Sequence, residues 1–281
     1  NWTQEQLDDQ INQTSYSPHN LKEIIENYAR TSNRVRSQLP YRTFSYGDGP
    51  NEKLDVFAPE AAKDLPVMVF IHGGAWATWT KDDFSSAAPT FTGAKAVYVV
   101  LGFDNIPPNT MGGVVDQCRK ALAWVRHHAD EIGADPKKIY VSGHSSGGHL
   151  ANVMLATEWK KHGLPADVIK GGVVLSGWTD LNPISLSNRN SYLKLGPTQI
   201  KQFSPINFVK NVTCPVIVAW GGLESPYMQT QSAEWARALQ SEGRLAGVYR
   251  FAGYNHFEMP NLLNNKESEI TRATLALMGL I

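Results

Sequence analysis

The sequence has little of what marks several large classes of protein. It contains only two cysteines, Cys118 and Cys214, which are too few for a disulfide framework. The 26 Lys and Arg residues balance the 26 Asp and Glu residues, so nothing indicates a surface for nucleic acid or another polyanion. No apolar run is as long as a membrane span, and the polar start NWTQEQLDDQ is unlike a signal peptide. We therefore expect a cytoplasmic protein with buried free thiols, no nucleic-acid partner and no membrane partner.

Motifs for metals and dinucleotides are missing as well. The eight histidines show no ligand spacing such as H-E-x-x-H, and two distant cysteines do not make a zinc site. No G-x-G-x-x-G follows the first apolar run, so a dinucleotide cofactor is not expected. The chain also has no internal repeat and no low-complexity linker. What it does have is a composition of 42% hydrophobic and 19% charged residues, which is typical of a globular protein with a large core.

Short apolar runs alternate with amphipathic stretches along most of the chain. Continuous runs of this kind are typical of parallel strands that are covered on both faces. The amphipathic stretches between them include residues 114–129 and 148–161, and residues 267–280 predict a closing helix. This alternation predicts an α/β fold with a doubly wound, mostly parallel sheet. The predicted strands are YRTFSYG, KLDVFAP, PVMVFIH, AVYVVLG, KIYVSG, GGVVLSG, PVIVAWGG and GVYRFAG.

Two segments depart from the alternation. Residues 1–40 are polar and partly helical, and we interpret them as an N-terminal helical lid segment of a single domain that spans residues 1–281. Residues 180–211 lack a clean period and are rich in Pro, Ser and Asn. We interpret them as a lid insertion over the carboxyl ends of the strands, where ligands bind in sheets of this type.

The stretch VSGHSSGGHL predicts a nucleophile at Ser145. Residues 143–147 read G-H-S-S-G and match the G-x-S-x-G elbow, in which a sharp turn lifts the central serine above the sheet. Small neighbours are needed because the turn is strained and crowded. Glycines and serines also populate ordinary turns, so the pattern gains weight from its place between a predicted strand and a predicted helix.

A serine nucleophile needs a base and an orienting acid, in the chain order Ser, acid, His. His256 lies after the last predicted strand and is the predicted base, because His149 and His162 belong to or end helices. Glu224 directly follows the strand PVIVAWGG and is the predicted acid. Asp180 also follows a strand and remains an open alternative for the acid.

The stretch IHGGAW predicts an oxyanion hole. It ends the strand PVMVF, and consecutive glycines allow backbone N–H groups to turn towards a developing negative oxygen. The candidate donors are the N–H groups of Gly73, Gly74, Ala75 and Ser146. One such donor typically contributes about 3–4 kcal/mol of transition-state stabilisation.

Aromatic residues are frequent in the predicted loops near these groups. They can form apolar walls or stack on a planar ligand, although each one can instead pack the base of a loop. The candidate substrate-binding residues are Trp76, Trp79, Phe103, Trp178, Tyr192, Tyr227 and Phe257.

Five motifs together resemble one family. HGGAW, GHSSGGHLA, LSGWTDLNP, GGLESP and GYNHF are similar to the α/β-hydrolase superfamily, in its kynurenine formamidase (arylformamidase) branch, which is related to hormone-sensitive-lipase-like esterases. The early YSPHN, residues 16–20, also resembles an element of that branch. The branch usually carries Asp as the acid, whereas this chain has Glu224. Asp180 therefore remains an alternative for the acid.

The resemblance implies a serine hydrolase that removes a formyl or acetyl group from an aromatic or apolar amide or ester. It also implies that Trp76 shortens the acyl pocket, with packing beneath the oxyanion loop as the alternative. The mechanism it implies is an acyl-enzyme on Ser145 with no metal and no cofactor. A carboxylesterase or carbamate hydrolase is the alternative, and a catalytically silent ligand-binding protein of the same fold is a remote one. The expected partner is a small-molecule substrate, and a homodimer is left open.

Overall fold

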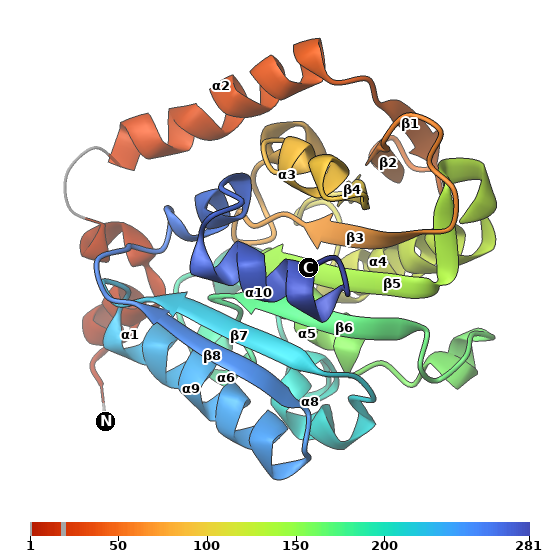
Figure 1. The fold of residues 1–281 in the computed structure, drawn as a ribbon. Helices are drawn as coiled ribbons and strands as arrows, with labels where there is room; N and C mark the ends of the chain where they lie inside the picture. The colour runs from red at the N-terminus through yellow and green to blue at the C-terminus, as the bar shows by residue number, and fades with distance from the viewer. Residues whose placement is uncertain (1, 18–20) are drawn as a thin grey trace.

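The computed structural model describes residues 2–17 and 21–281, and its strands form one eight-stranded sheet (Figure 1). The strand order is β1-β2-β4-β3-β5-β6-β7-β8. The strands are β1 (Arg42–Ser45), β2 (Lys53–Phe57), β3 (Leu65–Ile71), β4 (Val97–Leu101), β5 (Ala134–His144), β6 (Ile169–Leu175), β7 (Val216–Gly221) and β8 (Leu245–Phe251). All eight predicted strands are therefore present, and the predicted α/β fold class is confirmed.

Ten α-helices accompany the strands in the described part of the chain. No described helix combines the length and the apolar composition that a bilayer crossing requires. The helices are α1 (Gln4–Ile11), α2 (Leu21–Gln38), α3 (Ala88–Gly93), α4 (Met111–His127), α5 (Ser146–Leu155), α6 (Asn182–Leu186), α7 (Asn190–Leu193), α8 (Pro197–Phe203), α9 (Pro226–Ser241) and α10 (Glu269–Leu277).

The sheet is parallel from β4 and β3 through to β8. Only β1 and β2 run antiparallel to their neighbours, and the short turn between them allows this pairing. Every residue of β4 and β7 is buried, because helices cover both faces of the central sheet. Burial on both faces explains why these strands are continuous apolar runs rather than alternating ones.

The two faces of the sheet have separate hydrophobic cores. Side chains of α4, α5 and α9 pack on one face, with Leu122, Leu150 and Trp235 among them. Side chains of α2, α3 and α10 pack on the other face. Helix α2 is also joined to the sheet by charge, because the buried carboxylate of Asp55 on β2 pairs with Arg36.

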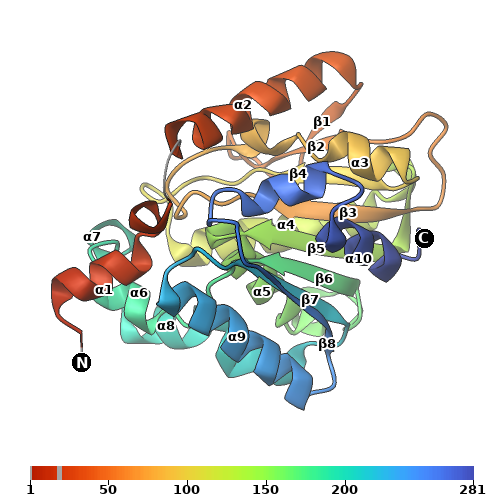
Figure 2. The same ribbon diagram turned by 60° about the vertical axis from the view of Figure 1, so that its left-hand side comes forward.

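The carboxyl ends of the parallel strands meet at one edge of the sheet, and the irregular segments collect there. The sequence of residues 180–211 has no regular period, and the segment forms the short helices α6, α7 and α8. Helix α1 contacts both α6 and α9, so the N-terminal segment lies against this insertion (Figure 2). Residues 18–20 of the YSPHN element lie outside the described residues.

Candidate active site

Ser145 stands on a strained turn between β5 and α5. Its φ of 58° and ψ of −122° are conformations that a residue with a side chain rarely adopts. The turn requires glycine on either side of it, since a Cβ on Gly143 would lie 2.2 Å from the Gly147 carbonyl oxygen. A Cβ on Gly147 would lie 2.1 Å from the carbonyl oxygen of Ile71. The sequence G-H-S-S-G is thus the local cause of the strained turn that presents the Ser145 hydroxyl to the cavity.

His256 lies within hydrogen-bond distance of that hydroxyl. It sits in the loop after β8, and its Nε2 is 2.8 Å from Oγ of Ser145. Its Nδ1 is 3.0 Å from Oε1 of Glu224. These two bonds define the tautomer: Nδ1–H donates to the carboxylate, and Nε2 accepts the serine hydroxyl proton.

Glu224 lies in the loop after β7 and is 2% exposed, so its charge depends on its hydrogen bonds. Its Oε1 accepts from the hydroxyl of Ser176 as well as from His256. Asp180, the alternative acid, has a different partner, because its Oδ1 accepts from the backbone N–H of Asn182 at 2.8 Å. Among the described residues Asp180 makes no hydrogen bond to His256, so the structure brings Glu224 to the base instead.

Burial controls the protonation of this pair. It lowers the pKa of His256 well below the usual range, and the positive charge of Arg189 lowers it further. Burial raises the pKa of Glu224, while the hydrogen bond from Ser176 opposes that shift. A depressed pKa keeps His256 neutral at neutral pH, which is the state that can accept a proton.

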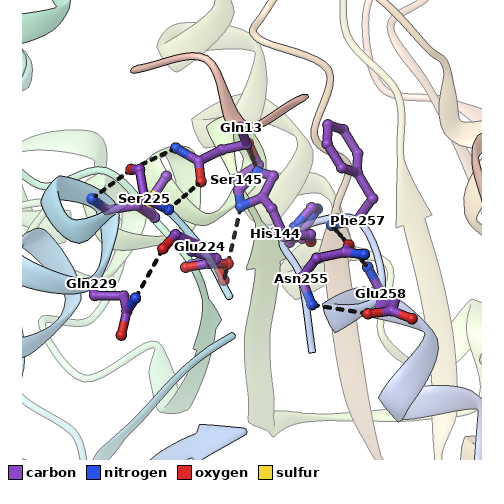
Figure 3. A network of polar contacts seen from close by, with 12 residues as sticks. Gln13, His144, Ser145, Glu224, Ser225, Gln229, Asn255, Phe257 and Glu258 are labelled. Carbon is purple, nitrogen blue, oxygen red and sulfur yellow. Dashed lines mark hydrogen bonds and ion pairs between the residues drawn. The ribbon is translucent and has the colours of Figure 1, made fainter. Parts of the chain in front are cut away.

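The loop that carries His256 is fixed by further hydrogen bonds. His144, the residue before Ser145, lies with its Nε2 2.8 Å from the carbonyl oxygen of His256. The carboxylate of Glu258 accepts from the backbone N–H of Asn255 at 2.8 Å (Figure 3). The position of the imidazole is therefore set from both sides of its loop.

Four backbone N–H groups stand near Ser145 without an acceptor among residues 2–17 and 21–281. They belong to Gly73, Gly74, Ala75 and Ser146, the predicted oxyanion donors. Gly74 and Ala75 have φ values of 109° and 54°, which turn this loop away from strand geometry. Both residues line the cavity above Ser145. The Ser146 N–H is also the first of helix α5, where backbone donors point out of the helix.

Ser145 and His256 open into a cavity of about 170 Å³. Its volume is below the range of about 300–1,000 Å³ that is usual for drug-sized ligands, so a small substrate fits it best. A larger hollow of about 770 Å³ near α10 contains no serine, cysteine or histidine. Within the described ranges, no group of three or more His, Cys, Asp and Glu side chains is placed to hold a metal ion. The cavity is lined by Asn12, Gln13, Thr14, Ile25, Gly74, Ala75, Thr78, Trp79, Ser145, Trp178, Arg189, His256 and Phe257.

Three of the predicted aromatic residues line this cavity, namely Trp79, Trp178 and Phe257. The other four are not among the residues that line the cavity. Phe103 stacks on the ring of His72, with ring centroids 4.3 Å apart. The hydroxyl of Tyr192 donates to the Ala75 carbonyl at 3.1 Å.

The remaining two aromatic residues are held in the same way. The hydroxyl of Tyr227 accepts from Nε2 of Gln231 at 2.9 Å. Trp76 is fully buried, and its indole N–H donates to Nδ1 of His149 at 3.2 Å. This geometry favours the packing alternative for Trp76 over a wall of the acyl pocket.

Sequence reasoning missed three polar residues of the site. Ser176 donates to Glu224, and Gln13 exchanges two hydrogen bonds with Ser225, the residue after Glu224 (Figure 3). Arg189 of the insertion lines the cavity. Ser176 carried a usable signal, because it ends a strand at the same edge as the other site residues. Gln13 and Arg189 lie in segments without periodicity, where nothing in the sequence distinguishes them.

Known proteins resemble this chain over most of its length. The family model BD-FAE matches residues 54–239. The kynurenine formamidase of Danio rerio is 30% identical over 240 residues, which are 83% of this chain and 80% of that protein. The isoprenylcysteine alpha-carbonyl methylesterase of Arabidopsis thaliana is 25% identical over 241 residues, which are 78% of this chain and 56% of that protein.

Solved structures agree on the fold. A protein of Silicibacter sp. tm1040, described provisionally as a thioesterase, has a TM-score of 0.82 and 25% identity, covering 95% of this chain and 98% of that one. The thermostable carboxylesterase EstE1, cloned from a metagenomic library, has a TM-score of 0.74 and 20% identity, with coverages of 95% and 98%.

Fold, site and relatives define the class: the protein is a hydrolase of the α/β-hydrolase superfamily. The chain belongs to the BD-FAE family, in its kynurenine formamidase-like branch.

Proposed function

We propose that the protein is a serine hydrolase that removes a formyl or acetyl group from an aromatic amide or ester. Ser145 is the nucleophile, His256 the base and Glu224 the acid. The observation that carries this proposal is the unbroken chain of hydrogen bonds from Glu224 through His256 to Ser145, which ends at a small cavity. The kynurenine formamidase of Danio rerio supports the amide reaction, because its name states a formamide substrate.

The reaction runs in two steps through an acyl-enzyme. The Ser145 oxygen attacks the acyl carbon, and His256 takes the hydroxyl proton. The bond from the acyl carbon to the leaving nitrogen or oxygen then breaks, and His256 gives the proton to the leaving group. Water repeats the sequence on the acyl-enzyme and releases formate or acetate. Glu224 stabilises the imidazolium that forms in each step.

The negative oxygen of both tetrahedral intermediates is stabilised by backbone donors. The unpaired N–H groups of Gly73, Gly74, Ala75 and Ser146 support this role, because an N–H without an acceptor is free to bind the oxygen. The indole rings of Trp79 and Trp178 and the ring of Phe257 form the apolar part of the cavity. They suit an aryl leaving group.

A carboxylesterase of small apolar esters, or a carbamate hydrolase, is the second candidate. The observation that favours it is the likeness to the methylesterase of Arabidopsis thaliana and to the carboxylesterase NlhH of Mycobacterium tuberculosis, which is 34% identical over 119 residues. The same three residues would perform either reaction, so the leaving group distinguishes the two.

Residues 1–40 and 180–211 act, in this proposal, as lid segments of one domain that covers residues 1–281. Hydrogen bonds between the two segments support it. The backbone N–H of Asn188 donates to Asp8 at 2.7 Å, and the side chain of Gln4 donates to the carbonyl of Leu186 at 2.9 Å. These bonds join α1 to the insertion.

Turnover of N-formylkynurenine, 4-nitrophenyl acetate and 4-nitrophenyl butyrate tests the proposed function. A formamidase hydrolyses the first at the highest kcat/KM. A carboxylesterase prefers the acetate and leaves the formamide nearly untouched. Hydrolysis of none of the three, by a folded protein, would contradict both candidates.

A cytoplasmic location and a homodimer complete the proposal. The two cysteines are buried and do not form a disulfide, as is usual for proteins of a reducing compartment. Strand β8 is one of the two edge strands of the sheet, and its Val248 is 45% exposed, which favours contact with a second copy. Light scattering of the wild type and of Val248→Lys tests the dimer. A monomeric wild type contradicts it.

A further inference from the structure

One positive charge lies in the wall of the catalytic cavity without a negative partner. Arg189 stands at the start of α7 in the insertion and lines the same cavity as Ser145 and His256. Its Nη2 donates to the backbone carbonyl of Ile11 at 3.2 Å. In the part of the chain that the structure describes, no ion pair includes Arg189. A single neutral carbonyl uses one of its five N–H donors and leaves its charge unbalanced.

The rest of the cavity wall offers no compensation. Its polar side chains are neutral, and none of the described lining residues is an aspartate or a glutamate. Arginine stays charged at all ordinary pH values, and the partly buried Arg189 therefore brings a positive charge to the cavity wall. Burial lowers the pKa of Arg189, and no carboxylate is among the groups that oppose this shift.

We propose that Arg189 is a specificity-determining residue that binds a carboxylate on the leaving group of the substrate. This inference rests on the proposed function and narrows it. A formyl or acetyl group carries no carboxylate, so the anion must belong to the part that leaves. The planar guanidinium matches a carboxylate through two parallel hydrogen bonds. The substrates are therefore small acyl derivatives of aromatic amines or phenols that also carry a carboxylate.

The position of Arg189 also links substrate recognition to the base. Burial lowers the pKa of His256, and the charge of Arg189, which lines the same cavity, lowers it further; His256 also contacts Glu224 and His144. A carboxylate bound to Arg189 cancels that effect. The pKa of His256 then rises in the enzyme–substrate complex, and the imidazole becomes a stronger base when the matching substrate is bound.

Matched substrate pairs test the proposal: the three acetoxybenzoates, with the carboxylate ortho, meta or para, and their neutral methyl esters. The variants are Arg189→Gln, which removes the charge, and Arg189→Lys, which keeps it. Lys201→Gln is the control, because Lys201 is an exposed cation of the same insertion and does not line the cavity. Thermal unfolding checks that each variant is folded.

In Arg189→Gln we expect kcat/KM for the preferred acetoxybenzoate to fall by about tenfold to a hundredfold, mostly through KM. The methyl esters should lose less, because they carry no carboxylate, so the ratio of kcat/KM for the acetoxybenzoate to that for its methyl ester should fall by about tenfold or more. Arg189→Lys should keep part of the preference, and Lys201→Gln all of it. In the wild type, the decline of kcat on the acid side of the pH profile should lie at higher pH for the acetoxybenzoate than for its methyl ester.

Equal losses for the charged and the neutral esters would overturn the proposal and make Arg189 a structural residue, while the proposed function would stand. A wild type without preference for any acetoxybenzoate overturns it as well.

If Arg189→Gln does not fold, benzoate and benzamide decide the question as inhibitors of 4-nitrophenyl acetate hydrolysis by the wild type. Benzoate must then compete at much lower concentration than benzamide. Failure of the wild type on every neutral ester would instead contradict the proposed function.

Discussion

The Nε2 atom of His256 lies 2.8 Å from Oγ of Ser145, although 111 positions separate the two residues in the chain. A second bond joins the same two loops, because Nε2 of His144 lies 2.8 Å from the carbonyl oxygen of His256. The turn that raises the serine therefore also holds the loop of the histidine. The geometry of the pair depends on the elbow as a whole rather than on two isolated side chains.

The first prediction concerns the acid. Glu224→Gln keeps the shape of the side chain but removes the charge that stabilises the imidazolium, so kcat should fall by about 10³-fold or more. Asp180→Asn is the matched control, since its carboxylate accepts from a backbone N–H and does not reach His256. It should change kcat by less than about threefold, as expected for a residue outside the triad. The reverse ranking, in two folded variants, would move the acid to Asp180.

The second prediction concerns Trp76. Trp76→Phe removes the indole N–H and leaves the buried Nδ1 of His149 without its donor. The free energy of unfolding should fall by about 1–3 kcal/mol. Because the indole lies beneath the oxyanion loop, turnover of acetyl and hexanoyl esters should fall together. Chain-length profiles of both proteins provide the measurement. A profile that flattens only in the variant would show that Trp76 does contact the acyl chain.

The third prediction concerns pH and stability. Burial lowers the pKa of His149 to about 4, whereas an unfolded histidine titrates near 6.5. As the pH falls, His149 is therefore protonated in the unfolded state before it is protonated in the folded state. Its contribution to the free energy of unfolding is complete above pH 6.5 and is lost as the pH falls towards 4. The loss is about 3 kcal/mol for this group.

His149→Gln isolates that contribution. Glutamine can accept from Trp76 and donate to the carbonyl of Phe203, as the neutral imidazole does, but it does not titrate. Urea unfolding at pH 7.5 and at pH 4.5 should show a smaller loss in the variant than in the wild type. Parallel losses in the two proteins would mean that His149 does not titrate on unfolding.

Much of the fold could be predicted, because burial on both faces turns the parallel strands into continuous apolar runs. The positions of Ser145, Glu224 and His256 followed from motifs at the ends of those strands. Arg189 could not be found in this way, since it is one cation in a segment without periodicity. Its place in the cavity depends on how the insertion folds over the sheet edge.

Side-chain direction was harder to predict than position. The motif HGGAW locates the oxyanion loop, but the sequence does not tell which way its tryptophan points. The φ values of 54° at Ala75 and 60° at Trp76 turn the indole away from the cavity and towards His149. Two positive φ values in adjacent residues with side chains arise from the surrounding packing, and no local pattern predicts them.

The central claim is that Ser145 is the nucleophile activated by His256. A fluorophosphonate that reacts with activated serines, followed by mass spectrometry of the intact protein and of its peptides, tests this claim most directly. We predict a single adduct on the peptide that contains Ser145, with loss of activity in proportion to labelling. Ser145→Ala should remain folded, take up no label and lose at least about 10³-fold in turnover. An adduct on another residue, or a Ser145→Ala variant that keeps more than about a tenth of the wild-type turnover, would contradict the account.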